Sequence, residues 1–124
     1  MTNTDVTFVH RGVARFYEGS IRIDLRTILA VIPVSEVRKL EQHWPAAVYD
    51  ISEIMKTSEA PPVGKAWITR SGRAVLFNIN GVRFVSPLVQ IRGIISGERK
   101  HAHFAQMHEV PTIAATEQQS EVTP

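Results

Sequence analysis

Cationic, amide and aromatic side chains recur along the second half of the chain, within a stretch otherwise rich in Val, Ile and Phe. Arginine binds carboxylates and phosphates through a planar fork of N–H donors, and an exposed tryptophan can stack on unpaired bases. The candidate binding residues are Lys65, Trp67, Arg70, Arg73, Asn78, Arg83 and Arg92. Their chemistry suits a partner that carries phosphates or carboxylates. The alternative is that these cations are solvated strand residues that protect strand edges and solubility.

Two turn signals, Ser71-Gly72 and Asn80-Gly81, decide which of these side chains share a face. Each lies between short runs of β-branched and aromatic residues, a pattern typical of tight β-hairpins. We predict strands over 65–70, 73–79 and 82–86, followed by a fourth over 88–95. Directly opposed residues share a face. The register predicts these opposed core residues: Ile79 with Val82, Phe77 with Phe84, and Val75 with both Ser86 and Ile68. The residues expected on the other face are Lys65, Trp67, Thr69, Leu76, Asn78, Arg83 and Val85.

Positive charge is concentrated in the same half of the chain. Between positions 65 and 108 there are seven Lys and Arg residues and a single acid, Glu98. The register places Arg70 opposite Arg73 on the core-side face, beyond its apolar part, and Lys65 and Arg83 on the other face. One continuous basic patch is therefore not expected.

Three histidines near the end of this segment form the one group with metal-ligand chemistry: His101, His103 and His108. An H-x-H pair on a strand projects two imidazoles to one face, where a third ligand could complete a site. On a helix, by contrast, His101 and His103 diverge and cannot share a metal. We predict a helix here and no metal site.

No catalytic motif is present. The sequence has no Gly-rich phosphate loop, no G-x-S-x-G elbow and no H-E-x-x-H pair. The acids Asp24, Glu36, Asp50 and Glu53 are scattered singly, as expected for hairpin faces and helix starts. We therefore expect a protein that is not an enzyme and needs no cofactor.

The first half of the chain also contains strand patterns. We expect a strand over 6–10, a hairpin of 13–17 and 20–25 around Glu18-Gly19, and a buried strand over 27–32. A helix then begins near the N-cap Ser35 and ends at Pro45, with Val37, Leu40 and Trp44 on its buried face. Residues 46–55 suit either a strand or a helix, and a short helix over 51–56 is favoured.

The predicted fold is mainly β: an antiparallel small barrel or compact sandwich of seven or eight short strands with one or two short helices. It occupies residues 6–109, after a frayed segment 1–5 and before a disordered tail 110–124. A second helix is expected over 98–107. The expected core residues are Phe16, Ile21, Ile23, Ile28, Leu40, Ile68, Val75, Phe77, Ile79, Val82 and Phe84.

The two halves of the chain resemble each other. An offset of 61 positions aligns five identical pairs: Phe16 with Phe77, Arg22 with Arg83, Ser35 with Ser96, Arg38 with Arg99, and Lys39 with Lys100. The offset also aligns the predicted hairpin, third strand and helix of each half. This pattern predicts tandem ββββα pseudo-repeats over 6–44 and 65–107, joined by the Pro-containing linker 45–64.

Composition limits the class of protein. The chain has 124 residues, 44% of them hydrophobic, no cysteine and a net charge of +2, values ordinary for one soluble domain in a reducing compartment. It has no basic start followed by an apolar stretch and no apolar run long enough for a membrane span. A cytoplasmic location is expected.

Together these patterns favour a non-catalytic β-rich binding or adaptor module for protein–protein interaction or self-association, docking through unpaired strand edges and the Pro61-Pro62 segment. The alternative is a nucleic-acid-binding domain that uses the basic second half. Only Trp67 offers a stacking surface on the outward face, which ranks this alternative second.

Overall fold

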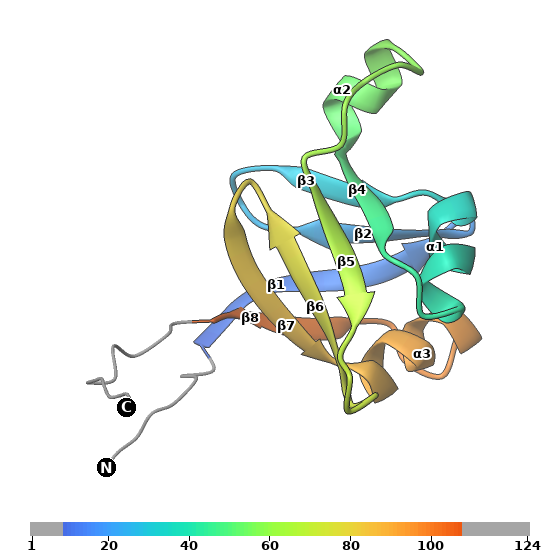
Figure 1. Ribbon diagram of the computed structural model, residues 1–124, viewed down its shortest axis with the longest axis vertical. Helices are drawn as coiled ribbons and strands as arrows, with labels where there is room; N and C mark the ends of the chain where they lie inside the picture. Colours follow the sequence, from blue (N-terminus) through green and yellow to red (C-terminus); the bar gives the residue numbers. More distant parts are fainter. Residues whose placement is uncertain (1–8, 108–124) are drawn as a thin grey trace.

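In the computed structural model, which describes residues 9–107, eight antiparallel strands close into a barrel (Figure 1). Each strand pairs with the next along the chain, and β8 pairs with β1. This confirms the small antiparallel barrel of the sequence-based prediction. The strands are β1 (Val9–Tyr17), β2 (Ser20–Asp24), β3 (Leu29–Ile32), β4 (Ala46–Asp50), β5 (Gly64–Ile68), β6 (Ala74–Ile79), β7 (Val82–Pro87) and β8 (Ala102–Gln106).

Three short helices connect strands in the described part of the chain: α1 (Val34–Glu41), α2 (Ile51–Lys56) and α3 (Leu88–Ser96). Since α1 joins β3 to β4 and α3 joins β7 to β8, each half has the order strand, strand, strand, helix, strand. Figure 1 shows α1 and α3 on one side of the barrel, whereas α2 projects away from it. The large side chains that α1 and α3 bury are Val37, Leu40, Leu88, Ile91 and Ile94.

The predicted register of the β5–β6–β7 meander is confirmed. Val75 lies opposite both Ile68 and Ser86, Phe77 opposite Phe84, and Ile79 opposite Val82. Asn80 and Gly81 both take positive φ, 53° and 82°, as a two-residue turn that matches the twist of a hairpin requires. Because the turn fixes the register, it also fixes which side chains of β6 and β7 face outward.

The barrel interior is filled by apolar side chains from every strand. Phe104 packs on Phe77 and Phe84 with ring centroids 5.7 Å and 5.6 Å apart. Eight of the predicted core residues are buried: Ile21, Ile23, Leu40, Ile68, Val75, Phe77, Ile79 and Phe84. Phe16 and Ile28 are partly buried against this core. Val82 is wrong as a core residue, because it lies beside the turn and is 37% exposed.

Two elements near the end of the domain differ from the prediction. Residues 88–95, expected as a strand, belong to α3, and 98–107, expected as a helix, contain β8. Pro87 is the N-cap of α3 and cannot donate to a strand ladder. Leu88, Ile91 and Ile94 then recur at helical spacing, so the helix buries one apolar face. Gly97, with φ of 89°, ends it.

The start and end of α1 were also predicted wrongly. Its N-cap is Pro33, without a side-chain capping bond, instead of Ser35. Val37 and Leu40 are buried as expected, but Trp44 is 65% exposed. The helix ends at Glu41 and His43 takes a positive φ of 64°, which turns the chain before Trp44 could continue the buried face.

In the first half, the strands expected separately over 6–10 and 13–17 belong to one continuous strand, β1, whose register changes between His10 and Gly12. A Cβ at Gly12 would lie 2.5 Å from the Asp24 carbonyl oxygen and 2.6 Å from the Phe104 ring, so no larger residue fits. The favoured helix over 51–56 is confirmed as α2.

Segment 45–64 supplies β4 and α2 to the barrel as well as a linker. The offset of 61 aligns β3 with α3, so the predicted pairing of third strands is wrong, and the order in each half is βββαβ instead of ββββα. The expected frayed start 1–5 and disordered tail 110–124 lie outside the described residues.

Candidate functional site

The outer face of β5, β6 and β7 carries two rows of side chains that run across the strands. One row is polar and basic, with Asn78 between Lys65 on β5 and Arg83 on β7. In the next row Leu76 lies between Trp67 and Val85, all three half-buried. Six of the seven predicted outward residues thus lie on one face, and the seventh, Thr69, lies just beyond the end of β5.

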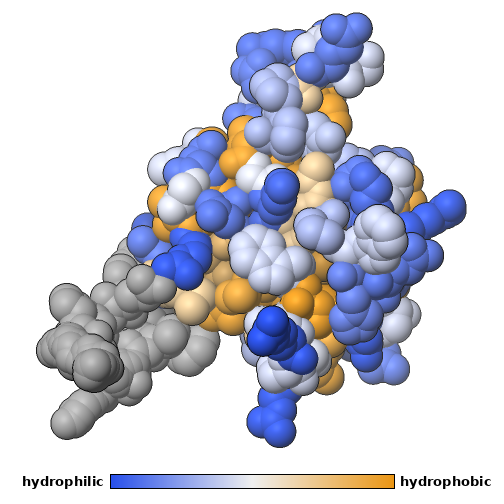
Figure 2. All heavy atoms as spheres, in the orientation of Figure 1, coloured by the Kyte–Doolittle hydropathy of each residue, from blue (hydrophilic) through white to orange (hydrophobic). Residues whose placement is uncertain are grey.

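A hollow of about 400 Å³ adjoins the apolar row beside α3. Val85 belongs both to the row and to the hollow, so the two form one apolar surface. In Figure 2, hydrophobic surface is visible over the centre of the barrel, surrounded by hydrophilic side chains. The lining residues are Arg73, Ala74, Val85, Pro87, Gln90, His103, Phe104 and Ala105. We call the row and the hollow together the apolar groove.

Polar contacts fix the wall of the apolar groove formed by β8. The Ser86 hydroxyl donates to the His103 carbonyl at 2.8 Å, and the His103 N–H donates to Gln90 Oε1 at 2.8 Å. Ser86 is fully buried and Gln90 lies on α3, so β7, β8 and α3 are tied together at this point. The groove is therefore held by the scaffold before any partner binds.

The remaining predicted binding residues, Arg70, Arg73 and Arg92, belong to neither row. Arg70 and Arg73 are exposed in the β5–β6 connection, not opposed on a strand, and Arg73 lines the apolar groove. Arg73 lies on one side of the apolar row, and Arg83 and Lys65 lie on the other side. The cations therefore flank apolar surface instead of forming one patch. Arg92 is exposed on α3, away from the strand expected for it.

The histidine positions can be judged in part. His101 and His103 are exposed, and His103 lies on β8, opposite Val13. Among residues 9–107 no group of three or more His, Cys, Asp or Glu side chains could hold a metal ion. His108 lies outside the described residues.

The scattered acids have structural roles. Glu36 on α1 accepts from the Ala47 N–H at 2.8 Å and pairs with Lys39 at 3.0 Å, which links α1 to β4. Burial raises the pKa of Glu36, but these two contacts outweigh burial, and the pKa lies below its ordinary value. Asp24 accepts from the Arg26 N–H at 2.9 Å, within its own turn.

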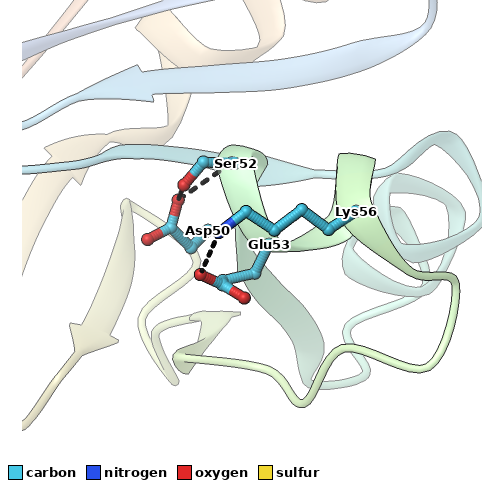
Figure 3. A network of polar contacts seen from close by, with 4 residues as sticks. All are labelled: Asp50, Ser52, Glu53 and Lys56. Atoms are coloured by element: carbon cyan, nitrogen blue, oxygen red, sulfur yellow. Dashed lines mark hydrogen bonds and ion pairs between the residues drawn. The ribbon is translucent and has the colours of Figure 1, made fainter.

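Figure 3 shows the acids of α2. Asp50 is the N-cap and accepts from the Ser52 hydroxyl at 2.7 Å and from the Ser52 N–H at 3.0 Å. These bonds hold the pKa of Asp50 below its ordinary value. Glu53 pairs with Lys56 at 3.5 Å one turn along the helix. Both acids thus serve the helix that carries them.

A second group of cations, not identified from the sequence, lies on the opposite half of the barrel. Arg15 on β1 and Arg22 on β2 are directly opposed and border a hollow of about 250 Å³. The Glu18-Gly19 turn could have revealed this pair, because a two-residue turn places Tyr17 opposite Ser20 and hence Arg15 opposite Arg22. The lining residues are Val13, Arg15, Arg22, Asp24, Leu29 and His101.

Comparison with protein families, with characterised proteins and with solved structures finds no match to this chain. Within residues 9–107 none of the helices has the length and apolar character to cross a membrane.

Proposed function

We propose that this protein is a non-catalytic binding module, whose apolar groove takes a protein segment with apolar side chains flanked by acidic ones. The observation that carries the proposal is the apolar row Trp67–Leu76–Val85 between Lys65 and Arg83 on one side and Arg73 on the other. Apolar side chains of a partner would cover the row, and its carboxylates would meet the cations.

Trp67 is the expected anchor of such an interface. It is half-buried and stands beside Leu76, with enough surface left to contact a partner. Tryptophan and arginine are the side chains most often responsible for binding energy at interfaces. The hollow next to Val85 offers a recess for an apolar side chain of the partner.

Docking through a strand edge, expected from the sequence, finds no support in the described strands. In a closed barrel every strand has a neighbour on both sides, so a partner cannot extend the sheet there. Binding through side chains of the outer face is the remaining mode that these strands offer.

A second copy of the chain and a nucleic acid suit the groove less well. Two copies meeting face to face would bring Lys65, Arg73 and Arg83 toward another set of the same cations. A nucleic acid would find one aromatic side chain, with Leu76 and Val85 beside it, where sheets that bind single strands offer several.

The test uses two fluorescent synthetic peptides of equal length with the same Leu and Phe residues. One has Glu and Asp at the flanking positions and the other has Lys. We expect saturable binding, followed by fluorescence anisotropy, of the acidic peptide alone. Trp67→Ala should weaken it by roughly tenfold or more.

Trp44→Ala is the matched control, because Trp44 is exposed beyond α1 and should leave binding unchanged. Equal binding of both peptides, or the same affinity in Trp67→Ala as in the wild type, contradicts the proposal. Single-stranded and duplex oligonucleotides, each at two salt concentrations, form the second arm. Salt-sensitive binding that weakens in Arg83→Ala and Trp67→Ala would instead favour the nucleic-acid function.

A further inference from the structure

The outer face of β1 and β2 carries a pair of like charges that the described residues do not neutralise. Arg15 and Arg22 are directly opposed across the two strands. Like charges in this position destabilise a sheet unless a counter-ion lies between them. The ion pairs of residues 9–107 are Lys39 with Glu36 and Lys56 with Glu53, so neither arginine takes part in one.

Arg22 also has a donor without an acceptor. Its Nε is buried and has no hydrogen-bond partner among the described residues. A buried donor left unpaired is costly, and in a native structure it calls for an explanation, of which a water or an ion from outside the protein is one. Asp24 lines the same hollow but is not the acceptor of this donor. Its Oδ1 accepts from the Arg26 N–H within its own turn.

The guanidinium of Arg22 is held in place before any ligand binds. Its central carbon lies over the Tyr17 ring, 4.7 Å from the ring centroid, an arrangement that favours a cation. A guanidinium fixed in this way loses less conformational freedom when it binds, and its planar fork matches the oxygen atoms of phosphate or carboxylate.

From these observations we infer that the hollow of about 250 Å³ between β1, β2 and β3 is a binding site for a small oxyanion, a phosphate or carboxylate group carried by a small molecule. Arg22 and Arg15 bind the anionic oxygens from opposite strands. His101 lies at the edge beside them, and Val13 and Leu29 contact an apolar part next to the anionic group. This site is separate from the apolar groove, and its ligand does not depend on the proposed function.

The test is an NMR titration of the whole protein that follows the Arg22 Nε–H signal and the backbone amides of β1 and β2. The amides also serve for Arg22→Gln, which lacks the Nε–H group. Sodium phosphate is added in one arm and sodium malonate in the other, with ionic strength held constant by sodium chloride. We expect a saturable shift in at least one arm, and the arm with the tighter binding distinguishes phosphate from carboxylate. Arg15→Gln and Arg22→Gln should each weaken the binding by roughly tenfold, as the loss of a charge-assisted hydrogen bond implies.

Arg38→Gln is the matched control, since it removes one charge from the exposed face of α1 and should leave the binding unchanged. If Arg22→Gln does not fold, Arg15→Gln supplies the comparison, and the ligand-dependent rise in Tm supplies a second readout for the wild type and Arg15→Gln. Shifts that stay linear in both arms, or a binding curve that is the same in Arg15→Gln and wild type, would overturn the inference.

Discussion

Hairpins β1–β2 and β6–β7 turn similar side chains inward and different ones outward. Both close through a two-residue turn of positive φ, Glu18-Gly19 and Asn80-Gly81. Inward, one hairpin contributes Ile21 and Ile23, and the other Val75 and Phe77, all fully or almost fully buried. Outward, β1–β2 carries the opposed arginines, whereas β6–β7 carries apolar side chains beside an amide and a cation.

The difference shows that the inward and outward positions of one hairpin meet different requirements. Closure of the barrel demands apolar side chains of suitable volume at alternate positions, and both hairpins meet that demand. The positions between them face outward and are free to serve binding, and at these positions the side chains of the two hairpins differ. We therefore expect inward substitutions to change stability and outward ones to change binding.

The largest effect is expected from Phe77→Ala on the inward face of β6. Phe77 is 1% exposed and contacts Phe104, so its truncation leaves a cavity in the core and should lower the free energy of unfolding by about 3–5 kcal/mol. Leu76→Ala is the control. The neighbouring Leu76 faces outward, so its truncation should lower the free energy of unfolding less than Phe77→Ala does. Urea denaturation measures both, and a loss below about 1 kcal/mol for Phe77→Ala would show that the register is wrong.

A second prediction compares the helices that close the two halves. α1 is tied to β4 through the carboxylate of Glu36 and the N–H of Ala47, whereas α3 has no acid in its first turn and is tied to β8 through the neutral amide of Gln90. Glu36→Ala leaves the partly buried Ala47 N–H without an acceptor and should cost about 1–3 kcal/mol. Glu41→Ala, an exposed acid of the same helix, should cost much less in the same urea experiment.

The Glu36 contribution should depend on pH. Its folded-state pKa lies below the ordinary value of 4.5, so the stabilisation is complete above about that pH and is lost as pH falls through the folded-state pKa. The stability difference between wild type and Glu36→Gln should therefore shrink from neutral pH to about pH 3. A difference that stays constant over this range would mean that the charge of Glu36 does not stabilise the fold.

The smallest effect is expected from Arg15→Gln on the outward face of β1. Removing one of two opposed cations, while Arg22 stays over Tyr17, should raise the free energy of unfolding by a few tenths to about 1 kcal/mol in buffer without oxyanions. Added phosphate should reverse the order of the two proteins. A destabilised Arg15→Gln in oxyanion-free buffer would show that the opposed arginines already have a partner.

Strands whose ends are marked by turn residues could be predicted from the sequence. Elements whose structure depends on packing against the closed barrel could not. Asn80-Gly81 fixed the register of Phe77 and Phe84, because a two-residue turn leaves one pairing. Residues 88–95 are equally rich in apolar side chains, and their local composition also suits a strand. They form α3 because a helix after Pro87 can bury Leu88, Ile91 and Ile94 against the barrel.

For the candidate sites, the sequence predicts which side chains share a face but not the hollows beside them. Trp67, Asn78 and Arg83 were placed on one face by the register of β5–β7. The pairing of Arg15 with Arg22 required the same step around Glu18-Gly19. The hollows were beyond sequence reasoning, because residues of the segment 101–105 line both of them. That segment was expected to be a helix, and it meets β7 and β1 only as β8 of the closed barrel.

The most direct test of two separate outer faces is an amide chemical-shift map of one sample, titrated first with the acidic apolar peptide and then with phosphate. We expect the peptide to shift amides of β5, β6 and β7 around Trp67, and phosphate to shift amides of β1 and β2 around Arg15 and Arg22, with neither titration altering the affinity of the other. Both ligands shifting the same amides, or neither giving a saturable shift, would contradict the division of the barrel into two recognition surfaces.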